Sequence, residues 1–136
     1  RIDYVRFNPT VEREIQDRTF LGQLLSNFTM KTIVPGIAQF APGAQVRKAA
    51  LEEVGGNPVF YVAMFMPKVS NRNENGKGLD ACRCSFTYSN GKQAYVFTVS
   101  AGIDPKGGST PQEAFIKTEK RLKRDLVSFF EDVRIQ

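Results

Sequence analysis

The sequence has no histidine and no tryptophan, and only two of its 136 residues are cysteine. Imidazole is the general base of Ser-His-Asp and Cys-His catalysis and a common zinc ligand, so the absence of histidine excludes these mechanisms. The glycines form neither the G-x-x-x-x-G-K-[ST] loop nor the G-x-G-x-x-G turn that bind nucleotide phosphates. What remains favours a protein that is not an enzyme and that has no cofactor.

The two cysteines, Cys82 and Cys84, are separated by one residue. In a strand, residues two apart lie on the same face. A disulfide across so short a loop would be strained, and two thiols are too few to complete a metal site in a chain without histidine. We therefore expect two small, partly buried thiols on one face of a strand.

Long apolar runs are also missing. The longest, Val59 to Met66, is far shorter than the roughly 20 residues that a membrane-spanning helix needs. Hydrophobic residues make up 41% of the chain and charged residues 24%, which is ordinary globular usage and argues against wholesale disorder. The length suits a single domain over residues 1–136.

Positive charge is in moderate excess, because 19 lysines and arginines outnumber 14 aspartates and glutamates, for a net charge of +5. The stretch from Lys106 to Arg124 holds six cations against two anions, Glu113 and Glu119, and so carries +4 of this excess. Such a concentration favours an acidic partner, and by itself it admits both nucleic acid and an acidic protein surface.

In the first third of the chain, apolar and polar residues first alternate and then recur with the period of a helix. Alternation predicts a short strand from Ile2 to Phe7. A helix follows, with Asp17 or Thr19 as its N-cap. Its apolar stripe has the spacing i, i+3, i+4, i+7 and consists of Leu21, Leu24, Leu25 and Phe28. The prolines and glycines at positions 35, 36, 42 and 43 predict an irregular connection.

Two hairpins are predicted next. Residues 45–54 and 59–66 are joined through Gly55-Gly56, and residues 79–88 and 93–101 through Asn90-Gly91, both typical hairpin turns. A polar loop from Lys68 to Gly78 separates the hairpins. Together with the helices, this order predicts an α+β domain: an antiparallel meander, formed by two hairpins and an N-terminal strand, packed against amphipathic helices.

The last helix is predicted to begin at Ser109 or Thr110, with Pro111 in its first turn. One stripe is apolar and consists of Phe115, Leu122, Leu126, Phe129, Phe130 and Val133. The opposite stripe is basic and consists of Lys117, Lys120, Arg121 and Arg124, which we call the basic stripe. It is either a solvated outer face or a docking patch for an acidic partner.

Aromatic residues recur along the predicted strands, at Phe60, Tyr61, Phe65, Phe86, Tyr88, Tyr95 and Phe97. Exposed on a sheet, with lysines nearby, such residues could stack on the bases of single-stranded nucleic acid. No RNP-like Lys/Arg-Gly-Phe octapeptide accompanies them. We therefore expect these aromatics to form the core beneath the helices, and we expect no nucleic-acid partner.

Taken in order, three stretches resemble the PsbP family, the extrinsic proteins of the thylakoid lumen. The first is Ile2 to Thr10 followed by Ile15-Gln16-Asp17. The second is Ala50 to Ala63, where Val54-Gly55-Gly56 precedes Val59-Phe60-Tyr61. The third runs from Leu79-Asp80-Ala81 through Asn90-Gly91-Lys92-Gln93-Ala94-Tyr95 and Ser100-Ala101 to the basic helix ending at Ser128-Phe129-Phe130. The family's opening strands and N-terminal extension have no counterpart in this sequence.

The resemblance implies a PsbP-like α/β/α sandwich and a non-catalytic subunit in the chloroplast thylakoid lumen, peripheral to the membrane. Its partner would be a photosystem, first of all the oxygen-evolving complex of photosystem II. We expect docking through the basic stripe, with Arg47 and Lys48 second. The family's role in calcium and chloride retention depends on the missing extension, so no cofactor or metal is expected. Alternatives are photosystem I, another thylakoid complex, a small GTPase bound by Ran-binding relatives of the fold, or single-stranded nucleic acid.

Overall fold

The computed structural model describes residues 1–6, 18–68 and 79–133. Five antiparallel strands form one sheet in the order β1-β5-β4-β3-β2, with helices packed against it, so the α+β prediction is confirmed. The elements in chain order are β1 (Ile2–Arg6), α2 (Arg18–Phe28), the π-helix η1 (Thr29–Ile33), α3 (Val34–Phe40), β2 (Gln45–Val54), β3 (Asn57–Met66), β4 (Ala81–Ser89), β5 (Gln93–Gly102) and α4 (Pro111–Val133).

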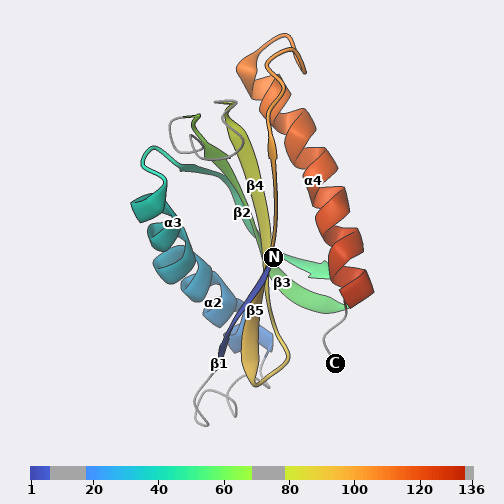
Figure 1. The fold of residues 1–136 in the computed structure, drawn as a ribbon. Coiled ribbons are helices and arrows are strands. Elements are labelled where there is room, and N and C mark those ends of the chain that lie inside the picture. Colours follow the sequence, from blue (N-terminus) through green and yellow to red (C-terminus); the bar gives the residue numbers. More distant parts are fainter. Residues whose placement is uncertain (7–17, 69–78, 134–136) are drawn as a thin grey trace.

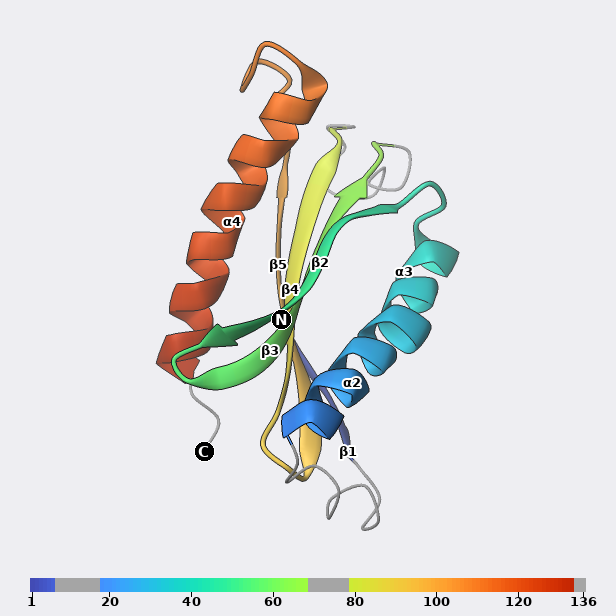
Figure 2. The same ribbon diagram turned by 180° about the vertical axis from the view of Figure 1, so that it is seen from behind.

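Helices cover both faces of the sheet, α4 on one side and the continuous α2–η1–α3 segment on the other (Figures 1 and 2). Side chains of β3 alternate between two cores accordingly. The core beneath α4 receives Val59, Tyr61, Ala63 and Phe65. The core beneath α2 receives Phe60, Val62, Met64 and Met66. Cys82 and Cys84 both lie in the α4 core, as their spacing predicted.

Both predicted hairpins are present. Gly55 and Gly56 have φ of +60° and +80°, backbone that glycine adopts without steric cost, and they form the whole β2–β3 turn. In the β4–β5 hairpin, Asn90 accepts hydrogen bonds at Oδ1 from the N–H groups of Lys92 and Gln93. Gly91 has φ of +97°, so this turn centres on Gly91-Lys92 rather than on Asn90-Gly91.

The predicted irregular connection at residues 35–43 is wrong for its first half, because the helix continues to Phe40. Proline lacks an N–H and its ring clashes with the carbonyl of residue i−4, which normally ends a helix. Here η1 widens the coil by one residue just before the proline, and Val34 donates its N–H to the carbonyl of Thr29. Pro35 then lies in the first turn of α3, directly after this wider turn.

Two predictions about helix starts have different outcomes. Thr19 is not an N-cap, because α2 already begins at Arg18. For α4 the prediction is confirmed: the N–H of Glu113 donates to Oγ1 of Thr110 at 3.1 Å, and Pro111 is the first helical residue. Asp17 as a cap, the Asn8-Pro9-Thr10 break, and the loop over 69–78 lie outside the described residues.

Gly22 lies at a close approach of α2 to the sheet edge. A Cβ at this position would lie 2.8 Å from Cδ2 of Leu51 on β2, which is closer than two carbons approach without a shift. Glycine in mid-helix costs about 1 kcal/mol relative to alanine. The contact is with the end of the Leu51 side chain, which is 52% exposed, so a larger residue at position 22 would require this side chain to move.

Candidate functional site: a basic face on the last helix and the second strand

The four residues of the basic stripe are exposed on the outer side of α4, opposite the side chains that enter the core. Among the described residues, Lys120, Arg121 and Arg124 have no carboxylate oxygen within the 4.0 Å of an ion pair. Their charges are therefore available to a partner. The four cations that the sequence placed on one stripe of this helix therefore lie on one exposed side of α4.

Arg47 and Lys48 join this face through a β-bulge. Val46 pairs with Met64 and Lys48 with Ala63, so Arg47 is the extra residue of β2. In an unbroken strand two successive side chains point to opposite faces, whereas a bulge re-aims one of them. Both residues consequently contact α4, and the sequence-predicted site residues of β2 and of α4 form one surface, which we call the basic face.

The contacts of these two residues differ in kind. The guanidinium carbon of Arg47 lies 4.8 Å from the ring centre of Phe65 and 5.5 Å from that of Phe115, both cation–π distances. Nζ of Lys48 lies 3.7 Å from Oε1 of Glu119. Since Phe115 and Glu119 are one helical turn apart on α4, the two cations line up along the helix.

Lys123 was not among the predicted site residues, yet it lies on the same side of α4. It forms an ion pair with Glu52 of β2, at 2.8 Å, and its Nζ lies 4.5 Å from the ring centre of Tyr61. An open depression on the surface is lined by Lys48, Glu119, Lys120, Lys123, Arg124, Val127 and Ser128. Lys123 connects this edge of β2 to α4, and its charge is paired with that of Glu52.

Glu119 appeared in the sequence as one of two anions within a basic stretch, but its side chain is directed inward and the residue is only 4% exposed. The hydroxyl of Tyr61, a fully buried residue of β3, donates to Oε1 of Glu119 at 2.5 Å. This hydrogen bond and the nearby ammonium of Lys48 stabilise the buried carboxylate. With Glu119 directed inward, the outer face of α4 is more basic than the count along the sequence indicates.

The buried polar cluster continues from Tyr61 to the cysteines. The Tyr61 oxygen lies 3.4 Å from Sγ of Cys84, and the two sulfurs lie 3.7 Å apart. Burial, followed by the bonds to Cys84 and Glu119, raises the pKa of the Tyr61 hydroxyl. The bond between the thiols raises the pKa of Cys82, helped by burial, and lowers that of Cys84. Both thiols are free and fully buried, so solvent does not reach them.

The described residues also bear on metal sites, membrane-spanning helices and stacking surfaces. Along residues 1–6, 18–68 and 79–133, no group of three or more Cys, Asp or Glu side chains is arranged to hold a metal ion. No helix in this part of the chain combines the length and the apolar character needed to cross a bilayer. Tyr61, Phe86 and Phe97 are fully buried beneath α4, so these rings offer no stacking surface to nucleic-acid bases.

Comparisons with known proteins leave the family open: no protein-family model matches the sequence, and no curated protein matches it significantly.

Proposed function

We propose that this chain is a non-catalytic docking protein of the thylakoid lumen, resembling PsbP, that binds the acidic luminal surface of a photosystem through its basic face. Photosystem II and its oxygen-evolving complex are the first candidate partner. Photosystem I and other thylakoid complexes are the alternatives. The proposal is supported most directly by the joining of the basic stripe with Arg47 and Lys48 on one exposed surface.

The helix dipole does not account for the basic stripe. The dipole favours cations only near the last turn of a helix, and the last turn of α4 contains none. Like charges three or four residues apart destabilise a helix by a few tenths of a kcal/mol per pair. The stripe therefore carries a small energetic cost in the isolated chain, and a partner with acidic side chains would turn this cost into attraction.

Salt dependence gives the first test. Thylakoid membranes stripped of their extrinsic proteins are incubated with the chain and sedimented at about 0.01 M and at about 1 M salt, where the Debye length is roughly 30 Å and roughly 3 Å. We expect binding at low salt and its loss at high salt. Absence of binding, or binding that ignores salt, would contradict the proposal.

Charge reversal localises the surface. A variant with all four cations of the basic stripe changed to glutamate should bind stripped membranes at least about tenfold more weakly at low salt. For a control of equal charge change, the stripe double variant Lys120→Glu, Arg124→Glu is compared with Lys31→Glu, Lys92→Glu, since both lysines are exposed elsewhere on the chain. The control should lose much less binding affinity than the stripe double variant. Purified particles of photosystem II and photosystem I, tested separately, would identify the partner.

A further inference from the structure

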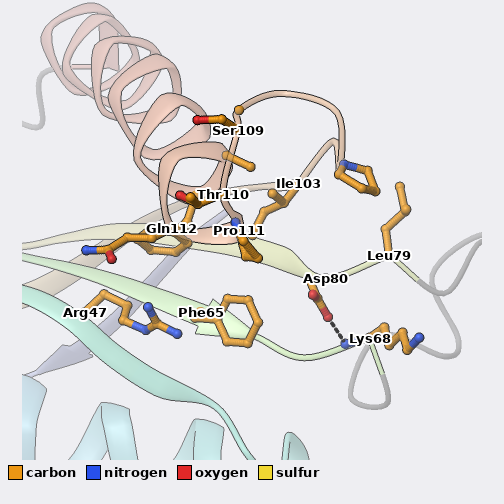
Figure 3. A pocket seen from close by; sticks show the side chains of 14 residues that line it. Arg47, Phe65, Lys68, Leu79, Asp80, Ile103, Ser109, Thr110, Pro111 and Gln112 are labelled. Atoms are coloured by element: carbon orange, nitrogen blue, oxygen red, sulfur yellow. Dashed lines mark hydrogen bonds between the residues drawn. The ribbon is translucent and has the colours of Figure 1, made fainter.

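A second feature of the same face is a pocket where α4 begins. It has a volume of 780 Å³, within the range of about 300–1,000 Å³ typical of ligand pockets. Its apolar lining consists of Phe65, Leu79, Ile103, Pro105, Pro111, Ala114 and Phe115. Figure 3 shows Arg47 and Gln112 at one end, and Leu79, Asp80 and Lys68 at the other.

Two aromatic rings hold Arg47 in place at this pocket. Its guanidinium lies over the rings of Phe65 and Phe115. These two rings pack edge to face, with their centres 6.2 Å apart. No carboxylate of the described residues forms an ion pair with it. Stacking on two rings orients the planar fork of an arginine and leaves its N–H donors free for a carboxylate.

The opposite wall depends on two glycines just before α4. A Cβ at Gly108 would lie 2.7 Å from Cβ of Glu113 and 2.8 Å from the backbone nitrogen of Ala114, so only glycine fits here without a shift. A Cβ at Gly107 would lie 3.1 Å from the carbonyl oxygen of Asp104. The chain can therefore fold back tightly onto the start of α4 and close this side of the pocket.

We propose that this pocket binds an acidic side chain on an extended segment of the docking partner, with the carboxylate on Arg47 and a neighbouring apolar side chain between Phe65 and Ile103. The inference rests on the proposed docking function and names the feature that the partner must present. The proposal is supported by charge complementarity: the guanidinium of Arg47, which forms no ion pair within the described residues, lies at the end of an apolar pocket and matches one carboxylate beside an apolar group.

The test uses the intact chain and two short peptides, acetyl-Gly-Leu-Asp-Phe-Gly-amide and its twin with Asn in place of Asp. Isothermal titration should give a Kd for the Asp peptide about tenfold below that of the Asn twin. Backbone NMR shifts on binding should map to Ile103, Gln112 and Ala114. The variant Arg47→Gln should remove the difference between the peptides, and Arg47→Lys should keep part of it, because lysine retains the charge but not the fork.

Lys92→Gln is the matched control, since it removes one exposed positive charge from the β4–β5 turn and should leave both affinities unchanged. Equal affinity for the two peptides, unaltered binding by a folded Arg47→Gln chain, or NMR shifts confined to the basic stripe would each overturn the pocket proposal. So would the absence of peptide binding. If the pocket fails while charge reversal of the basic stripe still abolishes membrane binding, the docking function stands without it.

Discussion

The buried hydrogen bond from Tyr61 to Glu119 should be one of the largest polar contributions to the stability of this fold. Tyr61→Phe removes one oxygen atom from the interior and leaves the shape of the side chain intact. The carboxylate of Glu119 then loses its 2.5 Å donor, and within the described residues the ammonium of Lys48 at 3.7 Å remains as its partner. A hydrogen bond to a charged group contributes about 1.5–3 kcal/mol, and we expect a destabilisation of this size.

Urea and thermal unfolding, both followed by far-ultraviolet circular dichroism, measure the change in the free energy of unfolding and in Tm, since the chain has no tryptophan to report by fluorescence. For a chain of this length, about 3–4 °C of Tm corresponds to 1 kcal/mol, so Tm should fall by about 5–12 °C. Tyr95→Phe is the matched control: its hydroxyl donates to Gln93 at 2.6 Å, but the site is only half-buried and water can replace the bond. The control should change stability by less than about 0.5 kcal/mol.

A double variant sharpens this prediction. Tyr61→Phe combined with Glu119→Leu removes both polar partners, and replacing both members of a buried pair by apolar groups is often close to neutral. The double variant should therefore be more stable than Tyr61→Phe alone. If Tyr61→Phe were as stable as the unmodified chain, the assignment of Glu119 as a buried carboxylate that depends on this hydroxyl would be wrong.

Three further predictions concern single positions. Gly108→Ala should destabilise the chain by about 1–3 kcal/mol in urea unfolding, because the new Cβ would lie 2.7 Å from that of Glu113. Gly36→Ala is the control: its Cβ would meet nothing within 4 Å, so this variant should stabilise the chain by about 0.5–1 kcal/mol, and equal effects of the two variants would contradict the packing. Hydrogen bonds from the hydroxyl and the N–H of Ser109 lower the pKa of Glu113 below its ordinary value of 4.5. The contribution of Glu113 to stability is therefore present above that pH and is lost as the pH falls through the lowered pKa. Glu113→Gln should lower Tm at neutral pH and have the same Tm as the unmodified chain in acid, and a Tm difference that does not change with pH would refute this. Cys82 and Cys84 should resist a thiol reagent in the native chain and release two equivalents on denaturation; rapid native reaction would show that the α4 core opens.

Much of the fold follows from patterns that repeat within a few residues. Residues 93–101 were predicted as a strand, and the alternate side chains of Tyr95, Phe97 and Val99 along β5 all pack into the α4 core. The apolar stripe of α4 packs into the same core, as its spacing predicted. Such patterns depend only on the period of a strand or a helix, so a single sequence contains them.

The sequence did not reveal features that depend on distant neighbours. The bulge at Arg47 depends on how β2 pairs with β3, and periodicity along one strand does not show it. The inward direction of Glu119 depends on Tyr61, which is 58 residues away. The helix through Pro35 required a π-turn, which propensity does not predict. In the candidate site, the sequence provided a set of candidate cations, whereas the structure showed which of them already have a partner.

Zero-length crosslinking of the bound complex tests the central claim most directly. A carbodiimide joins lysine amines to carboxylates only where the two are in contact, and mass spectrometry of the complex with photosystem particles identifies the joined pairs. The account predicts crosslinks from Lys117, Lys120 and Lys48 to acidic residues of a luminal subunit, and few from Lys31 or Lys92. Crosslinks that arise chiefly from Lys31 and Lys92, with the basic face unlabelled, would show that the chain docks through another surface.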